Sequence, residues 1–152
     1  MNTKQEENKN IEYDDKGNII IDTVELTIKK PKAGTLITGK DSSGFDQLPI
    51  PEVICDSENY FIGILNNEGK QRPEVYWKDY ATLVFYSDIK MEIGKSYTVF
   101  GRVQAKPGYV FYDPVNVIVN GEELSIEEVE DYTLEGDSFC FYYDLKIDNE
   151  DN

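Results

Sequence analysis

The 152-residue chain contains no histidine. Without an imidazole it cannot assemble Ser-His-Asp or Cys-His catalysis, His-ligated zinc, or the usual proton shuttle near neutral pH. Cysteine is also scarce, because Cys55 and Cys140 are too few for a four-cysteine zinc site. These absences remove most common catalytic arrangements, so we predict a protein that is not an enzyme.

Positive charge is in short supply as well. The chain has 15 Lys and Arg against 30 Asp and Glu, for a net charge of −15. Residues 101–152 carry 3 positive and 13 negative groups, so this third alone holds −10. Such a field repels nucleic acid and anionic lipid and favours cations or basic proteins. We therefore expect no nucleic-acid partner, and either a solvated acidic face or a surface for a basic protein.

Long hydrophobic runs are missing too. Residues 1–10 are polar and charged, without the apolar core of a signal peptide, and no later run approaches the length of a membrane span. We expect no membrane insertion. Two locations remain open: the cytoplasm if the 152 residues are a complete chain, or the cell surface or exterior if they are a piece of a secreted protein.

What the chain does contain is alternation with a period of two, which indicates half-buried strands. In Ser96–Ala105 the side chains of one face are Tyr97, Val99, Val103 and Ala105, with a gap at Gly101. Lys106-Pro107-Gly108 then predicts a turn, because proline presets φ and glycine accepts a positive φ. A second alternation at Val115, Val117 and Val119 ends at Asn120-Gly121, a strong hairpin signal.

Further strands are predicted along the chain. Their ranges are Ile19–Lys30, Glu52–Cys55, Tyr60–Leu65, Glu74–Lys78, Ala81–Tyr86 and Ser138–Ile147. Gly34–Pro51 has loop composition, and Ser125–Glu128 fits a capping box and predicts a short helical turn. Seven to nine short strands without a βαβ pattern favour an all-β antiparallel sandwich over residues 19–147. Residues 1–18 predict a disordered or loosely docked arm, and residues 148–152 an acidic tail.

The order of these motifs resembles a bacterial immunoglobulin-like (Big-type) module. The residues that carry the resemblance are Gly94, Tyr97, Val99, Val103, Ala105, Gly108, Tyr109, Phe111, Val117, Val119, Asn120 and Gly121, together with Val24–Ile28, Pro31, Ala33, Gly34, Val75 and Trp77. Such modules are common in secreted and surface proteins of Gram-positive bacteria. The resemblance covers roughly residues 21–147 and implies a β-sandwich with a binding or spacer role, without fixing a ligand.

The order Cys55, Trp77, Cys140 is similar to that of antibody-type sandwiches, in which a disulfide joins the two sheets. The tyrosine expected two residues before the second cysteine is absent, because position 138 is Ser. Two unpaired thiols that act as small apolar residues are the other interpretation.

Cofactor motifs are weak. Gly34 to Lys40 approaches a phosphate-binding loop, but Asp41 stands where a hydroxyl residue is needed. Paired carboxylates such as Asp14-Asp15 lack the calcium-loop spacing. We therefore expect no cofactor and no metal.

A carbohydrate partner is suggested only by tyrosines that exceed the needs of a core: Tyr76, Tyr80, Tyr86, Tyr112, Tyr142 and Tyr143.

The acidic last third suggests one specific binding surface. Carboxylates spaced along a β-surface can imitate nucleic acid and occupy the basic cleft of a protein partner, as in small inhibitors of phage or immunity type. The candidate residues are Glu122, Glu123, Glu127, Glu128, Glu130 and Asp131. The sequence thus predicts a non-enzymatic binding or spacer module of a surface protein, with an acidic cytosolic inhibitor as the alternative.

Overall fold

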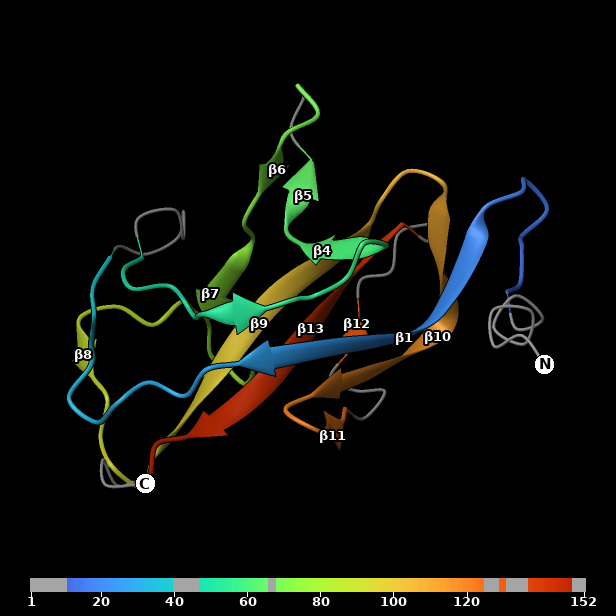
Figure 1. Ribbon diagram of the computed structural model, residues 1–152. Helices are drawn as coiled ribbons and strands as arrows, with labels where there is room; N and C mark the ends of the chain where they lie inside the picture. Colours follow the sequence, from blue (N-terminus) through green and yellow to red (C-terminus); the bar gives the residue numbers. More distant parts are fainter. Residues whose placement is uncertain (1–10, 40–46, 66–67, 125–128, 131–136, 149–152) are drawn as a thin grey trace.

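The computed structural model describes residues 11–39, 47–65, 68–124, 129–130 and 137–148, and in these ranges every regular element is a β-strand (Figure 1). The long strands are β1 (Ile19–Ile28), β9 (Ser96–Ala105), β10 (Tyr109–Val119) and β13 (Ser138–Lys146). The short ones are β2 (Leu36–Ile37), β3 (Val53–Ile54), β4 (Tyr60–Ile62), β5 (Ile64–Leu65), β6 (Gln71–Arg72), β7 (Val75–Trp77), β8 (Ile89–Lys90), β11 (Glu122–Glu123) and β12 (Val129–Glu130). The predicted all-β class is confirmed. The described strands outnumber the predicted seven to nine because two-residue pairings form inside expected loops.

Two larger sheets and two small ones organise these strands. One sheet has the order β11-β10-β1-β3, and the other β12-β13-β9-β4, with β7 also paired to β9. In Figure 1, β9 and β13 run side by side through the molecule. The pairs β2–β8 and β5–β6 form the small sheets.

The prediction of a wholly antiparallel fold is wrong, because β1 and β10 pair in parallel and make their sheet mixed. The chain makes a tight turn between β9 and β10. Tyr109 N–H donates to the Lys106 carbonyl at 3.0 Å, with Gly108 at φ 93°. The chain then joins β1 instead of folding back on β9. Alternation tells which face of a strand is buried, but it does not tell the direction of the neighbouring strand.

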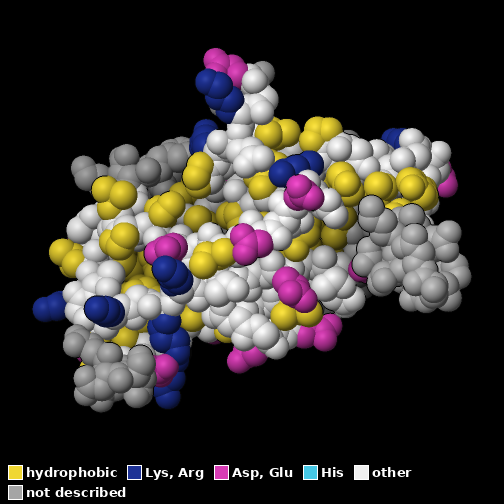
Figure 2. All heavy atoms as spheres, viewed as in Figure 1, with side chains coloured by type: hydrophobic (Ala, Val, Ile, Leu, Met, Phe, Trp, Pro, Cys, Tyr) yellow, Lys and Arg dark blue, Asp and Glu magenta, His cyan; other side chains and the backbone are white. Residues whose placement is uncertain are grey.

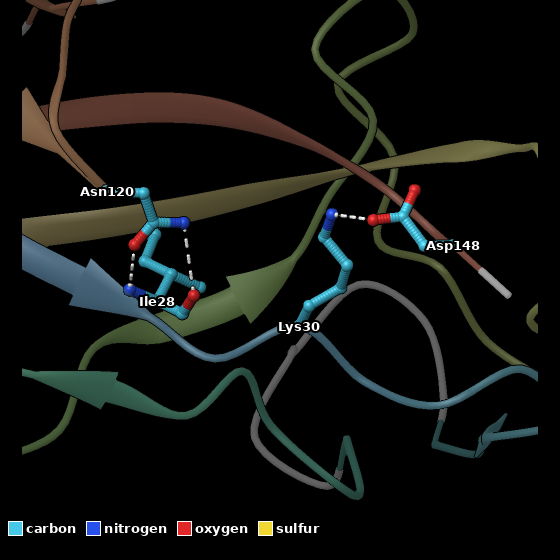
Figure 3. Close-up of polar contacts among 4 residues, drawn as sticks. All are labelled: Ile28, Lys30, Asn120 and Asp148. Carbon is cyan, nitrogen blue, oxygen red and sulfur yellow. Dashed lines mark hydrogen bonds and ion pairs between the residues drawn. The ribbon is translucent and has the colours of Figure 1, made fainter. Parts of the chain in front are cut away.

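The hairpin predicted at Asn120-Gly121 is confirmed, with φ values of 52° and 81° and pairing of β10 with β11. The Asn120 side chain also joins β1 (Figure 3). Ile28 N–H donates to Asn120 Oδ1 at 2.8 Å, and Asn120 Nδ2 donates to the Ile28 carbonyl at 3.1 Å. Two residues on, Lys30 Nζ lies 2.5 Å from Asp148 Oδ2 and ties the end of β1 to the segment after β13. Asn120 thus links the ends of the parallel strands β1 and β10, and Lys30 links the end of β1 to the other sheet.

One hydrophobic cluster contains buried side chains from both larger sheets. The Phe111 ring of β10 meets the Phe139 ring of β13 edge to face, with centroids 4.8 Å apart. The buried rows of the first and last strands consist of Val24, Leu26 and Ile28 in β1 and of Phe139, Phe141, Tyr143 and Leu145 in β13, and Trp77 is 1% exposed. The gap at Gly101 is filled by its cross-strand partner Phe141, whose ring would lie 2.7 Å from a Cβ at position 101.

Three predicted segments differ from the structure. Ala81–Tyr86 is not a strand, because Leu83 N–H donates to the Asp79 carbonyl at 2.7 Å and closes a turn whose tip is exposed. The run meets the end of β7 only at its last residues, where Phe85 forms a bridge with Lys78 and Tyr86 N–H donates to the Trp77 carbonyl at 2.9 Å. The predicted loop Gly34–Pro51 contains β2, which pairs with β8. The predicted strand Tyr60–Leu65 is divided at Gly63 into β4 and β5.

The described part of the predicted N-terminal arm is hydrogen-bonded to β1. Ile20 N–H donates to the Glu12 carbonyl at 2.8 Å, and Tyr13 forms a bridge with Ile19. The Asp14 carboxylate accepts from Asn18 N at 2.7 Å and from Asn18 Nδ2 at 3.1 Å, and these bonds lower the pKa of Asp14. Residues 12 and 13 of the predicted arm are thus paired with the start of β1. Residues 1–10, the predicted helical turn 125–128 and residues 149–152 lie outside the described residues.

Candidate functional site

The surface beside β7 carries an exposed run of apolar residues. Leu48 is 64% exposed and Ile50 39%, although both are large aliphatic side chains. They border a groove of about 550 Å³ that we call the apolar groove. Its lining is Leu48, Pro49, Ile50, Pro51, Glu52, Val53, Ile62, Pro73 and Val75. Figure 2 shows hydrophobic side chains gathered on this face over β3, β4 and the base of the β5–β6 hairpin. Contiguous apolar surface of this kind marks interaction sites.

A buried glutamine holds one wall of the groove in place. Gln47 Nε2 donates to the carbonyls of Trp77 at 2.9 Å and Tyr86 at 2.6 Å, and Trp77 N–H donates to Gln47 Oε1 at 2.6 Å. The Trp77 indole N–H donates to the Pro49 carbonyl at 3.0 Å. The main chain of the wall is therefore fixed from inside, while Leu48 and Ile50 face outward.

The opposite wall is the base of the hairpin formed by β5 and β6. This hairpin projects from the sheet in Figure 1, and Ile62 and Pro73 lie where it begins and ends. Gly63 sits between β4 and β5 at φ 132°, and a Cβ at this position would overlap the Arg72 carbonyl oxygen. Only glycine fits here, so Gly63 sets where the hairpin leaves the sheet.

Glu52 is the one charged residue in the lining of the groove. Its carboxylate lies 3.3 Å from Lys29 Nζ, with the side chains 66% and 59% exposed. Such solvated pairs are weak and exchange readily. The Glu52 main chain is fixed, because its carbonyl accepts from Lys29 N–H at 2.9 Å. The groove thus offers apolar contact together with one available negative charge.

The groove was not predicted from the sequence, because the composition of Gly34–Pro51 indicated only a loop. The available signal was Leu48-Pro49-Ile50-Pro51, where large aliphatic residues alternate with prolines. Proline lacks the N–H that a central strand would need, so these aliphatic side chains could not belong to a regular sheet.

The predicted acidic surface is described only in part. Glu122 and Glu123 lie exposed in β11, and the Glu130 backbone pairs with that of Cys140. Glu127, Glu128 and Asp131 lie outside the described residues. The structure therefore brings Glu122 and Glu123 together on one hairpin, and the six-residue surface remains a prediction.

The tyrosines that suggested a carbohydrate partner do not lie together on one exposed surface. Tyr76, Tyr142 and Tyr143 are buried, whereas Tyr80 and Tyr112 are exposed. Tyr76 and Tyr142 join Phe100 and Cys140 in a second hydrophobic cluster. Lys78 Nζ caps this cluster, 4.7 Å from the centroid of the Phe100 ring and 5.1 Å from that of the Phe85 ring. Tyr76 and Tyr142 therefore pack on one face of the sheet that contains β7, β9 and β13.

The two cysteines are not bridged. The interpretation without a disulfide is confirmed, and of the two thiols Cys140 is fully buried whereas Cys55 is half-buried. Burial, reinforced by the nearby Asp56 charge, raises the pKa of the Cys55 thiol to about 11. Cys55 is therefore almost entirely protonated at neutral pH and is a poor nucleophile.

Among the described residues, no three or more acidic or cysteine side chains are grouped to hold a metal ion. The same residues contain no helix with the length and apolar character needed to cross a membrane. Comparison of the chain with known protein families, with curated proteins and with solved structures gave no match.

Proposed function

We propose that this chain is a non-catalytic protein-binding module with an immunoglobulin-like β-sandwich fold. The single hydrophobic cluster shared by the two larger sheets supports the sandwich. The motif order around β9, β10 and β11 supports the immunoglobulin-like type, and with it a place in a surface or secreted protein.

The apolar groove is the observation that carries the binding role. Leu48 and Ile50 remain exposed on a main chain that Gln47 and Trp77 hold rigid. A preorganised apolar surface loses little conformational entropy when a partner binds, which is how small interfaces gain affinity. A spacer role alone gives no reason for such a wall.

The second candidate is an acidic inhibitor that binds a basic protein. Glu122 and Glu123 support it, since both are exposed on the β10–β11 hairpin of a chain with net charge −15. This surface would act through long-range attraction and would lose its partner at high salt.

Site-specific photocrosslinking tests the two candidates together. A photoreactive amino acid is placed at Ile50 in the apolar groove, at Glu122 in β11, or at Ile93, which is 58% exposed outside both surfaces. Each protein is irradiated in lysate and in surface extract of the source cells, and adducts are identified by mass spectrometry. We expect a discrete adduct from position 50 that is absent from position 93.

The other outcomes are equally informative. An adduct from position 122 alone would favour the acidic inhibitor. Equal adducts from all three positions, or none from any, would contradict a specific binding role and leave a spacer.

A further inference from the structure

The lining of the apolar groove restricts the chemistry of its ligand. Three of its residues are prolines: Pro49, Pro51 and Pro73. Prolines offer no N–H to a ligand, so these three positions give an added strand no backbone donors. Side chains that fill the groove therefore carry the recognition, and an apolar side chain has the matching polarity.

The charge of the chain argues against a second copy as the occupant. Two copies would each bring a net charge of −15 to the contact. Repulsion of that size keeps proteins monomeric, whereas a basic partner is attracted and steered to the surface.

Glu52 gives this attraction a location inside the groove. Arg72 and Glu74 flank Pro73 with opposite charges and offset each other. Lys29 pairs with Glu52 only across exposed side chains, so an incoming cation replaces it at little cost. A guanidinium suits this role because it binds a carboxylate through two parallel hydrogen bonds.

We infer, on the basis of the binding role proposed above, that the apolar groove binds a segment of a basic protein in which aliphatic side chains are flanked by Arg or Lys. The aliphatic side chains contact Ile50 and Leu48, and the flanking cation pairs with Glu52. The groove is thus the specific contact, and the acidic surface of the chain supplies attraction at longer range.

Three fluorescein-labelled peptides test this inference by fluorescence anisotropy. The first has leucines between two arginines, the second has glutamates in place of the arginines, and the third has serines in place of the leucines. Each is titrated with the 152-residue chain and with the variants Ile50→Ser, Glu52→Lys and Ile93→Ser. Ile93→Ser is the matched control, because it removes another exposed isoleucine that lies outside the groove.

We expect the arginine–leucine peptide to bind best, and Ile50→Ser to weaken it about tenfold, while Ile93→Ser leaves it unchanged. Glu52→Lys should reverse the order of the first two peptides, which a purely structural role of Glu52 would not do. Binding that depends on Ile50 but ignores peptide charge and Glu52 would overturn the inference and leave the groove as a binding site. Equal binding of the serine peptide would overturn both proposals. Binding of no peptide would overturn the inference alone, since the crosslink at position 50 tests the groove independently.

Discussion

At the scale of single residues, two side chains stand in for missing backbone partners. The Gln47 side chain bonds to the N–H and the carbonyl of Trp77, the last residue of β7. The Asn120 side chain bonds in the same way to the N–H and the carbonyl of Ile28, the last residue of β1. A primary amide has one donor group and one acceptor, as a peptide unit has, so it can extend a strand ladder. Such residues look polar and dispensable in the sequence, yet Gln47 is 3% exposed.

Replacing Gln47 with Ala should destabilise the protein by about 2–3 kcal/mol, because the buried Trp77 N–H and the partly buried Tyr86 carbonyl lose their hydrogen bonds to this side chain. Urea unfolding followed by fluorescence of Trp77, the single tryptophan, measures the loss. The matched control is Gln71→Ala in β6, an exposed glutamine, which should change stability by no more than about 0.5 kcal/mol. Equal effects of the two substitutions would contradict the role of Gln47.

The raised pKa of the Cys55 thiol should make the folding stability of the protein depend on pH. Its pKa is about 11 in the folded chain against 9.0 for the unperturbed group, so the folded state holds the proton more tightly. The corresponding stabilisation is complete below pH 9.0 and is lost as pH rises toward 11.

Unfolding free energies measured across that range should therefore fall less steeply for Cys55→Ala than for the native chain. Burial also raises the pKa values of Tyr76 and Tyr86, which contribute equally to both proteins. Burial raises the pKa of Tyr60 too, and the Cys55 charge raises it further, so the difference reports the thiol together with its coupling to Tyr60. Parallel curves would show that the thiol does not contribute.

At the scale of elements, glycine positions decide where strands stop. The Tyr60–Leu65 run is apolar enough for one strand, but Gly63 turns it away from β9 and into the β5–β6 hairpin. The base of this hairpin forms a wall of the apolar groove, so the turn at Gly63 is needed for the site to exist.

Gly63→Ala should cost about 3 kcal/mol, because the new Cβ meets the Arg72 backbone and φ of 132° is unfavourable for alanine. Gly69→Ala is the control: φ is also positive, at 79°, but no atom lies within 4 Å of the added Cβ. It should cost only about 1 kcal/mol. Chemical denaturation measures both, and a similar small cost for each would mean that the chain near Arg72 shifts freely.

At the scale of the whole molecule, the fold must withstand its own charge. A net charge of −15 opposes compaction, and the described ion pairs Lys29–Glu52, Lys30–Asp148 and Lys95–Glu92 are exposed at the surface. Stability therefore depends on the shared apolar cluster, which buries residues of both larger sheets.

Raising NaCl from about 20 mM to about 500 mM should increase the melting temperature, because salt screens repulsion among surface carboxylates. The double variant Glu122→Gln/Glu123→Gln removes two exposed charges from β11 and should melt higher at low salt, with a smaller response to salt. Calorimetry measures both effects. A melting temperature that falls with salt would mean that the ion pairs outweigh the repulsion.

Much of the fold followed from local patterns. The four long strands and the turns at Lys106–Gly108 and Asn120-Gly121 were predicted correctly, because alternation and turn chemistry are properties of neighbouring residues. Ala81–Tyr86 was predicted wrongly, because apolar composition does not show that the chain closes a turn between Asp79 and Leu83.

The sequence by itself determined the all-β class, the inward rows of the long strands and the acidic surface charge, since composition and period require nothing from distant residues. Tertiary structure alone decided that β1 and β10 are parallel, that Phe141 fills the space above Gly101, and that Leu48 and Ile50 border a groove. Each of these depends on contacts between segments far apart in the chain. Gln47 and Trp77 are separated by 30 residues, and Ile28 and Asn120 by 92. No local pattern encodes such pairings, because they arise only when the sheets share one core.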